Sequence, residues 1–314
     1  MPFAKKSQVF SASIQTVDIG AGEKKITLGG ENVLPFHWFD APVANAPKVG
    51  VEISDLGLED ETCPGILAYY DGCATVAEIA KRAAEIPGAS FICLRFDSAD
   101  PNGKNADVAA CVAVAKAVVE AIDLPLAVTG CKNLEKDAAI FGAVSEALQG
   151  KNILVLSARE EDYKSVGAAA ALAYGNKVGA ESAVDINLAK QLNVLMTQLG
   201  VKPESIVMNL GSAAAGYGFE YVASTIDRVK AAALAQNDAM LQMPIITPVG
   251  AETWSVKEAI MAEADMPEWG DQELRGIQME VVTASACLVS GSNAVILRHP
   301  KSVEKIAALI DALQ

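Results

Sequence analysis

Eight short apolar segments recur along the chain, each followed by residues that favour turns. Most are nearly continuous in hydrophobicity rather than alternating, which is typical of strands buried on both faces. They cover residues 48–55, 90–97, 124–130, 152–158, 177–183, 205–211, 244–250 and 293–299. The pattern predicts a parallel sheet whose two faces are both covered.

Amphipathic helical patterns lie between these segments. One apolar stripe, at 134–148, follows Asn133, a residue type that caps helix N-termini. Asp185 and Gly200 bracket a second stripe, at 188–199, as an N-cap and a C-terminal stop. Eight buried strands alternating with helices predict an α/β protein, a (β/α)8 TIM barrel.

The first forty residues do not follow this period. Residues 9–20 and 24–30 alternate like the two strands of a β-hairpin. We expect this hairpin, with LPFHWFD (34–40) after it, to plug the N-terminal mouth of the barrel. The predicted organisation is an N-terminal hairpin and lead-in at 1–46, followed by the barrel at 47–314.

The chain is acidic, with a formal net charge of −14 and a sequence pI near 4.6. Such a surface repels nucleic acid and anionic membranes, so neither is expected as a partner. The six cysteines stand singly, without any C-x-x-C pair, which argues against a metal or iron–sulfur site held by this chain. The N-terminus lacks a secretory pattern, and a cytoplasmic location is expected.

In a TIM barrel the functional groups cluster where the strands end. No lysine ends a predicted strand, which argues against Schiff-base chemistry, and the only two histidines are His37 and His299. We expect His37 to be structural, whereas His299 is open to either role. The strand-end candidates are polar and mixed: Asp55, Asp97, Thr129, Ser157, Ser182, Asn209, Thr247 and Arg298. They form no recognisable acid/base constellation, and no catalytic residue is predicted.

Two loops allow more than one reading. Asp97 and Asp100 could form an acid/base pair, although S-A-D-P-N-G is also ordinary turn chemistry, which is the favoured reading. Glu252 could reach into the barrel mouth or belong to the first turn of the next helix. The stretch NLGSAAAGYGFEY (209–221) follows strand six, and its glycines leave room for a flat, bulky partner.

Several segments carry a family resemblance. They are LPFHWFD (34–40), RFDSADPNG (95–103), SAVDINLAKQLNVL (182–195), GSAAAGYGFEYVASTIDRVK (211–230), PIITPVGAETWSVKEA (244–259), PEWGDQELRGIQMEVVTASA (267–286) and LRHP (297–300). In this order they resemble the small (delta) subunit of the corrinoid iron–sulfur protein of the acetyl-CoA decarbonylase/synthase system.

The resemblance implies a non-catalytic subunit of a methyl-carrier heterodimer. The larger (gamma) subunit of the family carries the iron–sulfur cluster and a corrinoid, which lies between that subunit and this barrel. The methyl group passes from methyltetrahydrofolate, by way of a methyltransferase, to cobalt and then to acetyl-CoA synthase, in the reductive acetyl-CoA (Wood–Ljungdahl) pathway. No metal ligand is expected on this chain.

The resemblance implies that a corrinoid lies against the barrel, and the residues at or after the predicted strand ends are the candidates to bind it. They are Asp97, Asn209, Gly211, Ser212, Gly216, Tyr217, Thr247, Glu252 and Arg298. Two alternatives stay open. One is a free-standing barrel methyltransferase that holds a pterin with Asp97, Asn209 and Asp55, and the other is a purely structural subunit of the complex.

Overall fold

The computed structural model describes residues 6–314, and within them eight parallel strands form one sheet. The strands are β3 (Lys48–Ser54), β4 (Ala89–Arg95), β5 (Leu126–Thr129), β6 (Leu154–Ala158), β7 (Lys177–Glu181), β8 (Ile206–Asn209), β9 (Ile246–Pro248) and β10 (Ala294–Leu297). Their spatial order is β8-β7-β6-β5-β4-β3-β10-β9, and a parallel bridge from Met208 to Ile245 joins the two edges. All eight predicted strands and the barrel are therefore confirmed.

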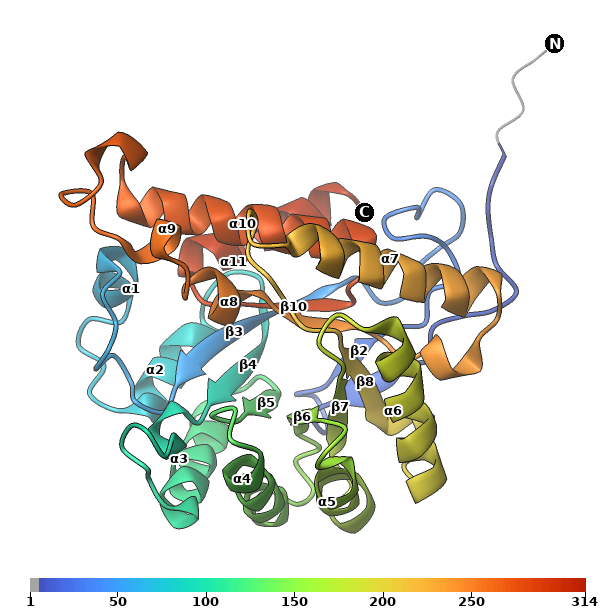
Figure 1. Ribbon diagram of the computed structural model, residues 1–314, viewed down its shortest axis with the longest axis horizontal. Helices are drawn as coiled ribbons and strands as arrows, with labels where there is room; N and C mark the ends of the chain where they lie inside the picture. The colour runs from blue at the N-terminus through green and yellow to red at the C-terminus, as the bar shows by residue number, and fades with distance from the viewer. Residues whose placement is uncertain (1–5) are drawn as a thin grey trace.

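Helices cover the outside of this barrel (Figure 1). They are α1 (Pro64–Tyr69), α2 (Val76–Ala84), α3 (Val108–Ala121), α4 (Leu134–Ala147), α5 (Tyr163–Gly167), α6 (Ile186–Leu199), α7 (Phe219–Ala235), α8 (Val249–Thr253), α9 (Lys257–Ile260), α10 (Gln272–Ser290) and α11 (Pro300–Ala312). Short 3-10 helices are η1 (Asp97–Ala99), η3 (Pro203–Ser205), η4 (Ala239–Leu241) and η5 (Pro267–Trp269), and η2 (Ala168–Ala173) is a π-helix that continues α5.

The helix signals in the sequence act as predicted. The Asn133 side chain accepts a hydrogen bond from Lys136 N, and Asp185 caps α6 by accepting from Asn187 N and Leu188 N. Gly200 ends α6 in the left-handed region, at φ +105°.

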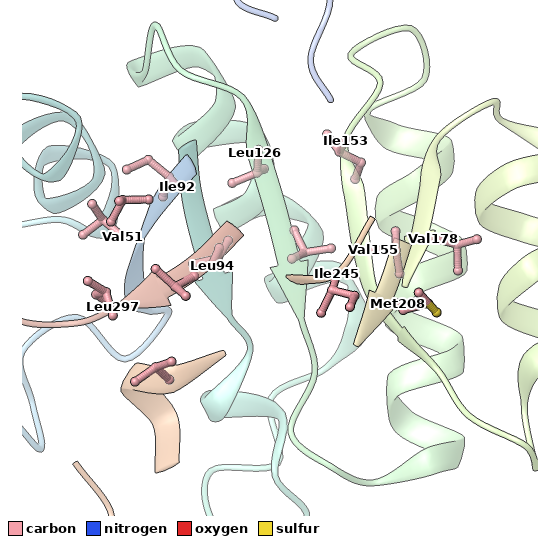
Figure 2. Packing of buried hydrophobic residues seen from close by; sticks show 14 of the residues in the cluster. Val51, Ile92, Leu94, Leu126, Ile153, Val155, Val178, Met208, Ile245 and Leu297 are labelled. Atoms are coloured by element: carbon pink, nitrogen blue, oxygen red, sulfur yellow. The ribbon is translucent and has the colours of Figure 1, made fainter. Parts of the chain in front are cut away.

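Each strand presents alternate residues to two separate cores, as the period of two requires. Val51, Ile92 and Leu94 belong to the outer core, between sheet and helices (Figure 2). Phe91 belongs to the inner core, which fills the barrel. Gly50 on the neighbouring strand makes room for the Phe91 ring, because a Cβ there would overlap it. A buried core on both faces explains the continuous hydrophobicity of the strands.

The N-terminal hairpin plugs the bottom of the barrel. β1 (Val17–Ile19) pairs antiparallel with β2 (Ile26–Leu28), and the apolar side chains of both strands join the inner core. Asn152, just before β6, donates its side-chain amide to the carbonyls of Asp18 and Gly20, at 2.8 and 2.9 Å. These contacts place the hairpin at the N-terminal ends of the strands, as predicted. The domain boundary at residues 46 and 47 stays a prediction.

Candidate functional site

A cavity of about 770 Å³ lies at the C-terminal ends of the strands. Every strand of the barrel contributes to its lining, through Glu52, Cys93, Thr129, Leu156, Glu181, Asn209, Pro248 and Ile296. Gly211, Ser212, Ala251 and Glu252 line it from the loop after β8 and from α8. This is the face on which TIM barrels build their functional sites.

A three-residue ion network occupies one wall of the cavity. Arg95 donates to Glu52 Oε1 at 3.0 Å and to Asp97 Oδ1 at 2.7 Å, and the Ser54 hydroxyl donates to Asp97 Oδ2 at 2.7 Å. Glu52 is 6% exposed, so its ion pair with Arg95 is largely shielded from water. The two carboxylates, Glu52 first, raise the pKa of the Arg95 guanidinium. Asp97 is therefore engaged in the wall of the cavity.

The other cations around the cavity are also paired. Arg159 contacts Glu181 at 3.1 Å, Lys132 contacts Glu252 at 3.2 Å, and Lys104 pairs with Glu59. Seven carboxylates and four cationic side chains line the cavity among the described residues, an excess of three negative charges. Since each cation already has a carboxylate partner, the cavity offers poor binding for a phosphate group.

Asn209 shapes the loop that follows β8. Its Nδ2 donates to Ser157 Oγ at 2.9 Å, and its Oδ1 accepts from Gly211 N at 3.0 Å. Gly211 has φ +82°, a conformation that favours glycine, and packs against the backbone of Ala183. Ser212 comes next, and its hydroxyl is buried without a hydrogen-bond partner in the described structure. Ser212 Oγ is thus a polar group beside the cavity whose hydrogen-bonding capacity the described contacts leave unused.

The remainder of this glycine-rich loop points away from the cavity. Gly216, at φ +87°, and Tyr217 are both exposed and do not line it. The Tyr217 hydroxyl donates to Glu258 in α9, and Ala215 N donates to Thr283 Oγ1 in α10 at 2.9 Å. The loop is therefore fastened to the helical wall and forms no phosphate cradle.

Two further predicted residues lie elsewhere. Thr247 is fully buried, with its hydroxyl 2.6 Å from Ser292 Oγ. Since Ile246 faces the inner core, the alternation of β9 turns Thr247 toward the outer side. Arg298 forms an ion pair with Glu61 at 2.8 Å and lines a second hollow, of about 260 Å³, beside α1 and β3. The cavity therefore brings together Asp97, Asn209, Gly211, Ser212 and Glu252 from the nine predicted residues.

Two further aspartates, Asp55 in the loop after β3 and Asp100 in the loop after β4, have structural partners. Asp55 accepts hydrogen bonds from the backbone N–H of Ser98, at 2.8 Å, and from the Ser98 hydroxyl. Burial raises the pKa of the Asp55 carboxyl. Asp100 Oδ1 accepts from Asn102 N at 2.8 Å, which is the turn that the sequence favoured. These contacts give Asp97 and Asp100 separate structural roles.

Eight charged lining residues were not predicted, and four of them lie in the strands or directly after one: Glu52, Arg95, Arg159 and Glu181. Glu52 and Arg95 lie inside apolar strands, near their C-terminal ends. A charge in that position, in a strand buried on both faces, is the signal that could have found them.

His299 lies in the one cluster of described residues whose composition could suit a metal. The candidate ligand atoms of Cys63, Glu273 and His299 lie within 4.8 Å of one another. His299 Nδ1 accepts from Lys301 N at 3.1 Å as the N-cap of α11, so the neutral ring carries its proton on Nε2. Nε2 faces Glu273 at 3.5 Å, and Lys301 Nζ also contacts Glu273. These contacts describe a buried helix cap with a neutral imidazole.

His37 also has a structural contact, since its Nδ1 lies 2.9 Å from Pro35 O. Among residues 6–314, no helix is both long enough and apolar enough to cross a membrane.

Sequence comparison identifies relatives of the chain. The profile of the CO dehydrogenase/acetyl-CoA synthase delta subunit family matches residues 16–303. The acetyl-CoA decarbonylase/synthase complex subunit delta 2 of Methanosarcina acetivorans is 31% identical, over 95% of this chain and 68% of the relative. The corresponding delta subunit of Archaeoglobus fulgidus is 30% identical, over 94% of this chain and 66% of the relative.

Structural comparison finds dihydropteroate synthases. The enzyme of Xanthomonas albilineans with 4-aminobenzoic acid has a TM-score of 0.58 at 13% identity, and the alignment covers 96% of this chain and 99% of the enzyme. The Thermus thermophilus enzyme in complex with 6HMPPP has a TM-score of 0.52 at 12% identity, over 96% of this chain and 99% of the enzyme. At this identity the likeness is one of fold, and it agrees with the TIM barrel.

Proposed function

The chain belongs to the CO dehydrogenase/acetyl-CoA synthase delta subunit family, and we propose that it is the small subunit of a corrinoid iron–sulfur protein. In this proposal a larger (gamma) subunit carries both the iron–sulfur cluster and the corrinoid. The barrel mouth of this chain covers the corrinoid from the other side. The chain is then a non-catalytic part of a methyl carrier, located in the cytoplasm.

The observation that carries the proposal is that most polar side chains at the cavity already have partners within the chain. Its arginines and lysines are ion-paired and Asn209 is hydrogen-bonded. Burial raises the pKa of the two lining thiols, Cys93 and Cys131, so neither is a ready thiolate nucleophile. No histidine in residues 6–314 lines the cavity, so a cobalt ligand of that type would come from elsewhere. A mouth of this kind suits contact with a cofactor more than chemistry of its own.

The residues present fit a corrinoid in three respects. The Ser212 hydroxyl is unpartnered and can bond to one of the amide groups at the edge of a corrin ring. The Lys132–Glu252 and Lys104–Glu59 pairs are solvent-exposed and can exchange partners with such amides at little cost. Leu156, Pro248 and Ile296 give the cavity an apolar floor, which excludes water.

When bound, the corrinoid would supply the cobalt that accepts a methyl group. We propose that a methyltetrahydrofolate-dependent methyltransferase provides this group and that acetyl-CoA synthase receives it. Both partners need access to the covered face, so the contact between the mouth and the corrinoid has to open in every cycle. Exposed ion pairs, typically worth 0–1 kcal/mol each, are consistent with a cover that releases easily.

Bulky side chains at the cavity test this function. The co-expressed heterodimer with Ser212→Trp or Ala251→Trp is expected to keep its stoichiometry but to show an altered corrinoid spectrum and about tenfold slower methyl transfer or more. Ser255→Trp is the control, since Ser255 is exposed and outside the cavity lining. If all three variants behave like the unmodified heterodimer, the chain is a purely structural subunit.

The pterin-binding alternative finds less support in the contacts. Asp97, Asn209 and Asp55, which would hold the pterin ring, each have hydrogen-bond partners within the chain. Titration of the isolated chain with methyltetrahydrofolate separates the two functions, because a corrinoid-covering subunit is expected to show negligible binding.

A further inference from the structure

Exposed apolar side chains gather on the wall formed by α7 and α10, which lie next to each other in Figure 1. Among residues 6–314, eleven large hydrophobic side chains are exposed, and six of them belong to this wall and its adjoining loops. We call these six the α7–α10 face: Tyr217, Tyr221, Ile260, Leu274, Val282 and Val289. The exposed fraction reaches 68% for Tyr221 and 57% for Val289. Exposed apolar side chains concentrated on one wall are typical of a protein interface.

The face contains a shallow hollow of about 280 Å³. Its apolar lining is Ala215, Met279 and Val282, and Arg275, Gln278 and Glu258, which accepts from the Tyr217 hydroxyl, border it. Arg275 cannot swing freely into the hollow, since its guanidinium donates to the carbonyls of Glu258 and Met261, both at 2.6 Å. The hollow is therefore a preformed apolar recess, of the kind that accepts an anchoring side chain of a partner.

One border of this face is strongly acidic. Residues 261–271, which connect α9 to α10 beside Ile260 and Leu274, contain four carboxylates and no lysine or arginine. Two cations of the flanking helices, Lys257 and Arg275, lie over the ring of Trp269. The complementary surface is one with an apolar centre and a basic border. A second copy of this chain fits poorly, because each copy carries a net charge of −14.

We propose that the α7–α10 face is the permanent docking surface for the larger subunit, through an apolar patch of that subunit bordered by lysine and arginine. This inference rests on the proposed function and adds the surface that holds the heterodimer together. The face lies on the helical wall, whereas the cavity lies at the strand ends. The permanent contact, at the α7–α10 face, is therefore separate from the contact at the cavity, which opens during methyl transfer.

Charge substitution on the face tests the proposal. Val282→Asp and Val289→Asp are each made in the full chain, which is then titrated with the purified larger subunit by calorimetry. The expected result is at least about 30-fold weaker binding for Val282→Asp, at the hollow, and a smaller loss for Val289→Asp. Leu172→Asp is the matched control, because Leu172 is 46% exposed in η2, which follows α5 away from this face in Figure 1. The control is expected to bind like the original chain.

Different failures have different meanings. If the original chain binds the larger subunit and Val282→Asp binds equally well, the docking surface lies elsewhere and the proposed function stands. If the chain instead forms a homodimer that Val282→Asp abolishes, the face is an interface but the assigned partner is wrong. If the chain binds no larger subunit and stays monomeric, both the inference and the proposed function are contradicted. Circular dichroism spectra and melting temperatures of all variants confirm that each is folded.

Discussion

Arg95 shows how a single residue governs the wall of the cavity. Its guanidinium joins the end of β3 to the loop after β4, through Glu52 and Asp97. Glu52 is almost completely buried, and Arg95 is the cation that pairs with it. The residue therefore stabilises the cavity by preventing an unpaired charge in the barrel.

Replacement of Arg95 measures this contribution. Arg95→Met leaves Glu52 without its cation and is expected to reduce the free energy of unfolding by about 3 kcal/mol in urea titrations. Lys132→Met is the control, because it breaks the exposed pair with Glu252 and should cost less than about 1 kcal/mol. Equal losses in the two variants would show that burial of Glu52 is unimportant.

His299 gives a second prediction at this scale. Burial and the nearby Lys301 lower its pKa to about 4, although Glu273 opposes the shift. In the unfolded chain the pKa is near 6.5. As the pH falls from 6.5 to 4, the unfolded chain binds the proton first, so the protein loses up to about 3 kcal/mol of stability over this window. Above pH 6.5 the contribution is fully present.

Urea unfolding at several pH values checks this sign. His299→Asn keeps a side chain that can cap α11 but removes the titration. As the pH falls from 6.5 to 4, the free energy of unfolding of the original chain should decrease relative to that of this variant. Glu280 and Asp137, whose pKa values burial raises, are common to both proteins and cancel in the comparison. A difference independent of pH would contradict the account.

The sequence predicted which segments line the cavity more accurately than which side chains do. It predicted that Asp97 and Asn209 follow buried strands, and both line the cavity. Thr247 was chosen by the same rule, but it lies one position out of phase with the inner face of β9. The end of a strand can be predicted from where its hydrophobic run stops. Whether a given side chain faces the barrel interior or the helices depends on the strand register, and a continuous apolar run does not specify that register.

At the scale of elements, the N-terminal hairpin is a structural part of the barrel. Val17, Ile19 and Leu28 are at most 1% exposed and complete the inner core together with Phe91. The alternation of apolar and polar residues made this hairpin visible in the sequence. Without it, the lower end of the inner core would face water.

Truncation of one hairpin side chain tests this role. Leu28→Ala is expected to reduce the free energy of unfolding by about 3 kcal/mol, through lost apolar burial and a residual cavity. Leu172→Ala, at an exposed position, should change it by no more than about 0.5 kcal/mol. A loss below 1 kcal/mol for Leu28→Ala would mean that the hairpin is not integral to the core.

The α7–α10 face could not be predicted from the pattern. α10 carries apolar residues around much of its circumference: Ile277 and Leu288 are buried, whereas Val282 and Val289 are exposed. When a helix has little amphipathic contrast, periodicity does not distinguish a core-facing position from an interface position. The tertiary structure was needed to separate them.

At the scale of the whole molecule, the two predicted contacts have different physical characters. The cavity has ion-paired walls above an apolar floor, with exposed charges at its opening, which suits a contact that forms and breaks. The α7–α10 face is apolar with a preformed recess, which suits a contact that lasts. One barrel thus provides both surfaces that a subunit of a methyl carrier would require.

Co-expression of this chain with the larger subunits of the same genome tests the central claim most directly. The measurement is affinity purification of the chain, followed by a visible absorption spectrum of the eluate. The account predicts an equimolar heterodimer with corrinoid absorption and a colourless product when the chain is purified alone. A monomer that co-purifies with none of the larger subunits but binds methyltetrahydrofolate would contradict the account.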